Sequence, residues 1–143
     1  MKVRILGCGT SGGVPRVGNL WGRCDPKNPK NRRRRVSILV EEQGAQILVD
    51  TSPDLREQLL DAEVTKLDAV LYTHDHADHT HGIDDLRGIF HSMHRPVDCY
   101  ANEATARTLM QRFGYVFEGF EGYPAIGKLH VIDEQSPIDV GPV

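Results

Sequence analysis

Residues 73–82 read THDHADHTHG and directly follow the short run LDAVLY at residues 67–72. That run is mostly apolar, which predicts a buried strand ending where the histidines begin. Neutral imidazoles and carboxylates are ligands that divalent transition metals prefer, and this segment gathers both within a few residues. A lone histidine would favour an ordinary polar loop. Several histidines and an aspartate in this order, just after a strand, predict a metal site.

The spacing inside this segment divides its side chains into two pairs. His74 and His76 are two residues apart, so on an extended backbone their side chains point the same way and can share one ion. Asp78 and His79 come where the chain must turn, and they can face a neighbouring position. Two such pairs suit two ions about 3.5–4 Å apart that are bridged by a water molecule.

Asp50 is a candidate for orienting these histidines. It ends a strand predicted at residues 46–49. A carboxylate at a strand end can accept the second N–H of a ligand imidazole and so fix the direction of the ring. A local turn or helix-cap contact is the other open interpretation of Asp50.

A glycine-rich turn at residues 7–15 follows the strand predicted at residues 3–6. Exposed backbone N–H groups near Gly12, together with the hydroxyls of Thr10 and Ser11, can hold a phosphate group. Tight-turn geometry by itself also explains the glycines. The turn lacks the Gly-Lys-Ser/Thr of a nucleotide-binding P-loop.

A long polar loop at residues 16–35 ends in four consecutive arginines, residues 32–35. A loop of this length is typically functional or disordered. Most of its charges are expected to form a solvated basic face. Alternation along the strand predicted at residues 36–40 sends neighbouring side chains to opposite faces, so Arg35 is a candidate contact for an anionic substrate.

The rest of the pattern predicts alternating strands and helices over one domain, residues 1–143, of the α/β (α+β) class. After the hairpin formed by residues 36–40 and 46–49, the expected elements are a helix beginning at Pro53 with Ser52 as its cap, a helix from residue 83, a strand at 97–101, a helix capped by Asn102 and ending at Gly114, and a strand at 129–133.

Composition narrows the class of protein. The net charge of −3 excludes an overall basic nucleic-acid binder, although a local basic patch remains compatible with it. No apolar stretch approaches the roughly 20 residues of a membrane span. The N-terminus lacks the pattern of a signal peptide. Cys8, Cys24 and Cys99 show no paired spacing, so we expect a reduced, cytoplasmic setting and no membrane association.

The motif at residues 73–79 with Gly82 resembles the signature of the metallo-β-lactamase superfamily of metal-dependent hydrolases. Further segments are similar to the phosphoribosyl cyclic phosphate phosphodiesterases within it: residues 9–15, 31–33, Ser37, Asp50 and 82–87. The tRNA 3′-end endonucleases share the glycine turn and the histidine loop. The resemblance runs over nearly the whole chain.

The resemblance implies an αββα sandwich with metals at one edge of the sheets. It implies that His74 and His76 bind one of two zinc or manganese ions, and that Asp78 and His79 bind the other. The family's third histidine, bridging aspartate and further histidine have no counterpart in residues 129–143. We therefore expect this chain to be the N-terminal portion of the fold, binding metal weakly and being a poor catalyst alone.

The expected activity is that of a metallo-hydrolase: a phosphodiesterase that cleaves a small cyclic phosphate or nucleotide-like phosphate ester with a dimetal-activated water. Asp78 would also orient this water. One alternative is an RNA-processing enzyme similar to the tRNA 3′-end endonucleases. A second alternative is a thioester or lactone hydrolase of the same fold. A third is a non-catalytic metal-binding or scaffold protein. The expected partner is a small phosphate-ester or nucleotide substrate, nucleic acid being less favoured, and the chain is a candidate homodimer.

Overall fold

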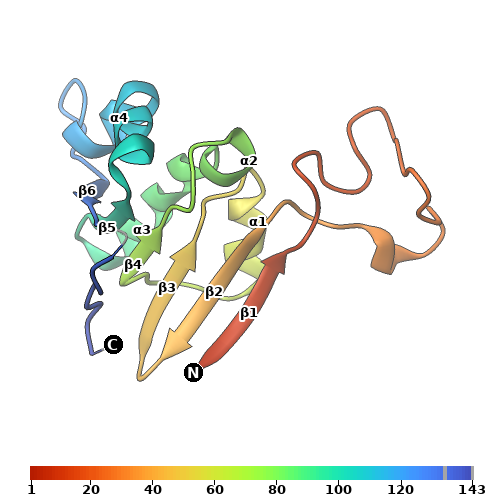
Figure 1. Cartoon of the computed structure of the whole chain (residues 1–143), viewed down its shortest axis with the longest axis horizontal. Helices are drawn as coiled ribbons and strands as arrows, with labels where there is room; N and C mark the ends of the chain where they lie inside the picture. The colour runs from red at the N-terminus through yellow and green to blue at the C-terminus, as the bar shows by residue number, and fades with distance from the viewer. Residues whose placement is uncertain (134, 143) are drawn as a thin grey trace.

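A computed structural model describes residues 1–133 and 135–142 (Figure 1). Its elements alternate as the sequence predicts. In chain order they are β1 (Lys2–Gly7), the 3-10 helix η1 (Pro29–Asn31), β2 (Ser37–Glu42), β3 (Ala45–Val49), α1 (Leu55–Asp61), β4 (Ala69–Leu71), α2 (Ala77–Thr80), the 3-10 helix η2 (Ile83–Asp85), α3 (Leu86–Met93), β5 (Val97–Ala101), α4 (Glu103–Glu118) and β6 (Gly127–Val131).

Six strands form one mixed sheet in the order β1-β2-β3-β4-β5-β6. The pairs β1–β2 and β2–β3 are antiparallel, whereas β3–β4, β4–β5 and β5–β6 are parallel. Because two antiparallel steps separate β1 from β3, these two strands run in the same direction. The carboxyl ends of β1, β3, β4, β5 and β6 therefore share one edge of the sheet. In open α/β sheets this is the edge where ligands bind.

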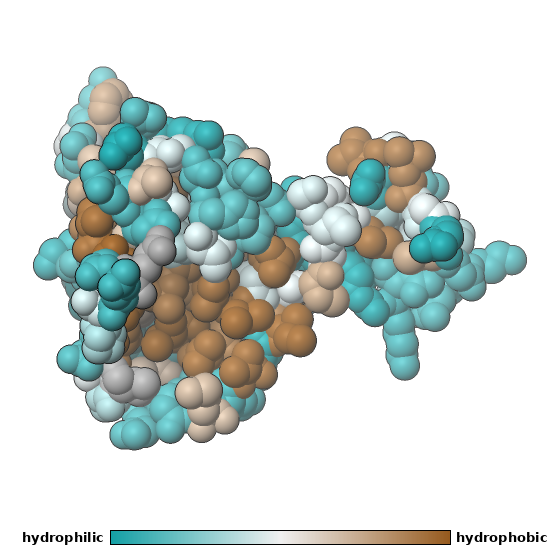
Figure 2. Space-filling view, in the orientation of Figure 1, coloured by the Kyte–Doolittle hydropathy of each residue, from teal (hydrophilic) through white to brown (hydrophobic). Residues whose placement is uncertain are grey.

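One face of the sheet packs against the helices and forms the core. Leu39, Leu48 and Val70 point into it from the three central strands, and all are 1% exposed or less. The opposite face is open, and Val3 and Ile5 of β1 are 52% and 68% exposed there. Figure 2 shows apolar side chains gathered over β1, β2 and β3 on this face. The described residues thus form one sheet with its helices, which is one of the two sheet layers of an αββα sandwich.

The segment between β1 and β2 extends away from the sheet as an arm (Figure 1). Isolated bridges join Gly9 to Arg35 and Val14 to Arg33, so the two ends of the arm run side by side. Within the described residues, no helix is long and apolar enough to cross a membrane.

Two helix boundaries differ from those predicted. Helix α1 begins at Leu55 instead of Pro53, because the Ser52 hydroxyl and carbonyl accept bonds from the Asp54 and Leu55 N–H groups in a turn that precedes the helix. Helix α4 continues past Gly114 to Glu118, with non-helical φ and ψ angles of −130° and 28° at Phe113. Its predicted cap is confirmed, since the Asn102 side chain accepts from the Thr105 N–H.

Candidate metal centre

The sheet topology brings three segments that are distant in the sequence to the same edge. Asp50 follows β3, the histidine-rich loop follows β4, and the glycine turn follows β1. Arg35 also lies at this edge, because β2 runs in the opposite direction and begins where β3 ends. The candidate site is therefore assembled from strand ends, as predicted for Asp50 and the histidine loop.

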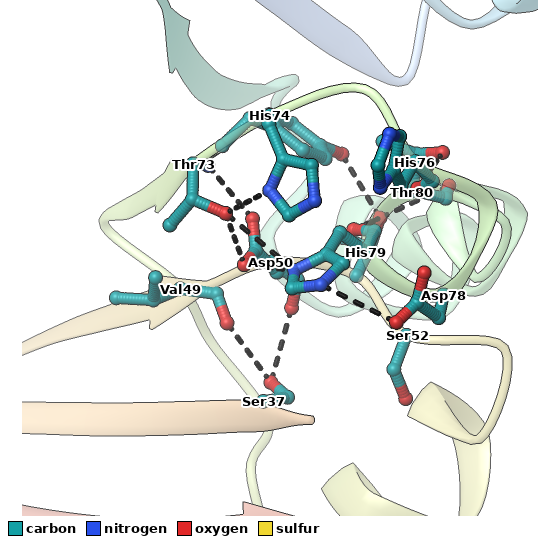
Figure 3. Close-up of polar contacts among 12 residues, drawn as sticks. Ser37, Val49, Asp50, Ser52, Thr73, His74, His76, Asp78, His79 and Thr80 are labelled. Carbon is teal, nitrogen blue, oxygen red and sulfur yellow. Dashed lines mark hydrogen bonds and ion pairs between the residues drawn. The ribbon is translucent and has the colours of Figure 1, made fainter. Parts of the chain in front are cut away.

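Asp50 is the centre of the polar network (Figure 3). Its side chain is almost fully buried, and its backbone adopts φ 62°, a left-handed conformation that aspartate tolerates better than most residues. Its carboxylate accepts from the Thr73 N–H at 2.8 Å and from the Thr73 hydroxyl at 2.7 Å. The same oxygen that accepts the hydroxyl lies 2.7 Å from His79 Nδ1. The contact expected between Asp50 and a histidine of the loop is present.

This network determines which ring nitrogen carries the proton in two of the imidazoles, those of His79 and His74. Since the Asp50 carboxylate can only accept, Nδ1 of a neutral His79 carries the proton and Nε2 keeps its lone pair. The Thr73 hydroxyl donates its proton to Asp50 and so accepts from His74 Nδ1, 3.0 Å away. For the same reason, Nε2 of a neutral His74 is unprotonated and keeps its lone pair. A free Nε2 is the state that a metal ligand needs.

The three imidazoles of the loop form one cluster. The ring centroids of His74 and His76 are 4.5 Å apart, and those of His74 and His79 are 4.0 Å apart. Asp78 Oδ2 lies 3.4 Å from His79 Nε2. Tetrahedral zinc with bonds of about 2.0–2.1 Å separates two ligand atoms by about 3.3 Å. The Asp78 and His79 pair is thus spaced to share one ion.

These groups supply only part of a coordination sphere. Over residues 1–133 and 135–142, no three His, Cys, Asp or Glu side chains are arranged to hold a metal ion by themselves. Zinc in proteins is almost always bound by at least three protein ligands. The weak metal binding expected of this chain alone stays a prediction.

The loop is anchored beneath the histidines by direct contact with the turn that follows β3. The Thr51 N–H donates to the His79 carbonyl at 2.8 Å, and the Gly82 N–H donates to the Thr51 carbonyl at 2.9 Å. A β-carbon added to Gly82 would lie 1.9 Å from the Ser52 carbonyl oxygen. Only glycine allows the loop to approach this turn so closely.

Arg35 forms two side-chain hydrogen bonds with Asp54 at the start of α1. Its Nε and Nη2 atoms donate to the two carboxylate oxygens at 2.9 and 2.6 Å. The side-chain hydrogen bonding that Arg35 donates to Asp54 raises the pKa of Arg35, and the negative charge of Asp78 raises it further. Arg35 thus lies close enough to the histidine-rich loop to interact electrostatically with the Asp78 carboxylate. The substrate contact predicted for Arg35 stays a prediction, and it would use donors other than these two.

The glycine turn closes through a bond from the Gly13 N–H to the Thr10 carbonyl at 2.8 Å. Thr10, Ser11 and Gly12 are exposed. In the part of the chain that the structure describes, no protein group accepts from the backbone N–H of Ser11 or Gly12. These donors are therefore open to solvent, and their predicted role in substrate binding stays a prediction.

The Arg35–Asp54 pair predicts a measurable pH dependence of stability. The Arg35 hydrogen bond holds the pKa of Asp54 below its ordinary value. The pKa of an aspartate in the unfolded chain is about 4. The stabilisation is therefore complete above that pH, and it is lost as the pH falls through the lower pKa of Asp54 in the folded protein. We expect Asp54→Asn to remove about 1 kcal/mol at neutral pH and to flatten the acid limb of an unfolding curve. Asp61→Asn, which breaks a more exposed pair with Arg34, serves as the control. Parallel acid limbs in wild type and D54N would contradict the prediction.

Thr73 begins the motif that carries the family resemblance, but the sequence analysis assigned it no role. Its hydroxyl links Asp50 to His74, and its backbone N–H holds the other Asp50 oxygen. Its place in that motif, directly before the first histidine, is the sequence signal for it. A hydroxyl there has many uses, and only the fold across β3 and β4 shows which one applies.

Residues 45–143 match the family model described as the beta-lactamase superfamily domain. The chain belongs to this superfamily, and its fold is the metallo-β-lactamase fold. The metal-dependent hydrolase family predicted from the histidine loop is thereby confirmed.

A crystal structure of a diphosphatase from the PhnP family is 36% identical, with a TM-score of 0.82, over 97% of this chain and 53% of its own. Zinc-bound PqqB from Methylobacterium extorquens is 24% identical, with a TM-score of 0.73, over 99% and 49%, and supports the fold alone. An octanoyltransferase of Porphyromonas gingivalis is 40% identical over 98% of this chain and 28% of its own length. A ribonuclease Z of Bradyrhizobium sp. is 40% identical over 60 residues, 41% of this chain and 20% of its own length.

The chain spans about half the length of these solved structures and less of the curated relatives. The PqqB structure is a zinc-bound one. One relative with this fold, the diphosphatase, is a hydrolase by its name. The octanoyltransferase name describes a protein of which this chain matches little more than a quarter.

Proposed function

We propose that the protein containing this chain is a metal-dependent phosphodiesterase acting on a small phosphate ester, such as a cyclic phosphate or a nucleotide-like ester. The observation that carries the proposal is the arrangement of His79. Its Nδ1 is held by the buried Asp50, and its Nε2 faces the Asp78 carboxylate at 3.4 Å. A histidine oriented by a carboxylate and paired with a second ligand is the usual construction of a metal site.

The residues of the loop would share the binding of two divalent ions, zinc or manganese. His74 and His76 would hold one, and Asp78 and His79 the other, with further ligands from outside the described residues. Bound there, such ions supply Lewis-acid activation of water and of a phosphoryl group. Asp78 has a second oxygen with which to accept a hydrogen bond from the attacking water and so direct it.

The preference for a phosphate substrate rests on three features. The diphosphatase, whose name states a phosphorus substrate, is similar over nearly the whole chain. The open N–H groups of the glycine turn lie at the same edge of the sheet as the histidine loop, where they can bind phosphoryl oxygens. The arginines of the arm add positive charge next to that edge, which favours an anionic substrate.

RNA processing is the second candidate, because the ribonuclease Z match and the basic arm both favour it. A substrate panel separates the candidates. The full-length protein, stripped with a chelator and reloaded with zinc or manganese, is assayed on a cyclic phosphate diester, a tRNA precursor and an acyl thioester. We expect metal-dependent cleavage of the cyclic phosphate. Selective cleavage of tRNA or thioester, or cleavage unaffected by the chelator, would overturn the proposal.

A further inference from the structure

One turn of α4 contacts the histidine loop at several points. Helix α4 departs from helical geometry at Phe113, and the side chains around this kink reach segment 75–84. The contacts are Arg112 Nη1 donating to the Asp75 carbonyl at 2.8 Å, the Phe113 ring edge-to-face with His81 at 5.4 Å, and the Tyr115 hydroxyl donating to Asp84 at 2.7 Å. The kinked turn thus follows the loop from its histidines to η2.

The Arg112 contact is placed where it affects two candidate ligands at once. Asp75 lies between His74 and His76, so the orientation of its peptide group sets the directions of both neighbouring side chains. The carbonyl of His76 is held by the His79 N–H and the Thr80 hydroxyl. Among the described residues, Arg112 is the only group that hydrogen-bonds the backbone of Asp75.

We propose that Arg112 is a positioning residue of the metal centre, which holds the backbone between His74 and His76 so that both imidazoles face the same ion. This inference rests on the proposed metal-dependent function. Arg112 touches neither histidine ring in the structure and acts through the Asp75 carbonyl. The bond is charge-assisted, which makes it stronger than an ordinary side-chain to backbone bond.

The positioning role has an effect opposite in sign to the effect of charge alone. A guanidinium near a cation site repels the cation, so removing it should strengthen metal binding on electrostatic grounds. If Arg112 instead fixes the loop, removing it lets the two imidazoles diverge and weakens binding. Substitution of outer partners of metal ligands costs 10- to 100-fold in affinity. Because Arg112 is exposed, we expect the lower end, about tenfold.

The test measures binding of Zn²⁺ itself. The metal-free full-length protein is titrated in competition with a chromogenic zinc chelator, as wild type, Arg112→Met, Arg112→Lys and Arg107→Met. Arg107 is the matched control, because it lies on the same helix, is exposed, and pairs only with Glu103 in the described contacts. Met keeps an unbranched apolar stem without the guanidinium in both variants, and Lys keeps the charge and a hydrogen-bond donor.

We expect the dissociation constant for zinc to rise about tenfold in R112M, to return most of the way in R112K, and to stay at the wild-type value in R107M. The melting temperature of the metal-free protein should be the same in all four. An unchanged or lowered dissociation constant in R112M, or an equal change in R107M, would overturn the positioning role while leaving the proposed function intact. Absence of zinc binding by the wild-type protein would overturn the proposed function itself.

Discussion

Replacing Asp50 with asparagine is expected to lower metal affinity by 10- to 100-fold in a protein that still folds. Asparagine tolerates the left-handed backbone at this position (φ 62°) and keeps one oxygen to accept from the Thr73 N–H. Its amide nitrogen replaces the oxygen that faces His79 Nδ1. An N–H donor there makes Nδ1 the acceptor and moves the imidazole proton to Nε2, the nitrogen required by a metal.

Alanine at position 50 is expected to cost stability as well as metal affinity. It leaves the Thr73 N–H and the His79 Nδ1–H without their buried acceptor. It also places alanine at a positive φ, a left-handed conformation that aspartate tolerates better. Two lost hydrogen bonds to a charged group, each contributing about 1.5–3 kcal/mol, together amount to about 3–5 kcal/mol.

Chemical denaturation and zinc titration of the full-length protein separate these two variants, and nitrogen NMR of His79 reports the tautomer directly. Asp61→Asn, an exposed carboxylate on α1, is the control for a simple loss of negative charge. Wild-type zinc affinity in D50N, or an unchanged His79 tautomer, would refute the role assigned to Asp50.

Replacing His76 with alanine is expected to reduce activity of the full-length protein by more than about 100-fold, beyond the range typical of outer partners of metal ligands. His76 is exposed, and its ring contacts only His74 among the described contacts. Its loss should therefore change the free energy of unfolding by no more than about 0.5 kcal/mol. A large loss of activity with little loss of stability is the result expected for a ligand.

His91→Ala is the matched control for this variant. His91 lies on α3, is exposed, and contacts only the neighbouring ring of Phe90 in the described contacts. We expect full activity and full metal content in H91A and low values of both in H76A. Retained turnover in H76A would remove His76 from the set of ligands.

Much of the fold was accessible from the sequence because its signals are local. The alternation of apolar residues placed β2 and β3 within about two residues of their observed bounds, and Asn102 marked the beginning of α4. The bounds that were wrong are the start of α1, the end of α4 and both ends of β6, which covers Gly127–Val131 instead of residues 129–133. The start of α1 depends on bonds made by Ser52 in a preceding turn, and α4 passes Gly114 because its kinked turn packs on the histidine loop.

The sequence by itself determined which side chains are candidate metal ligands, since three histidines and an aspartate follow one strand. It also indicated Asp50 as a candidate, but it did not decide whether Asp50 orients a histidine or makes a local turn or cap contact. Only the tertiary structure decided that Asp50 contacts His79, that Thr73 relays to His74, that Arg35 is paired with Asp54, and that Arg112 reaches the loop from α4. The physical reason is distance along the chain. Ligand identity is a property of residues a few positions apart, whereas proton position and orientation depend on partners that only the folded sheet brings within hydrogen-bond reach.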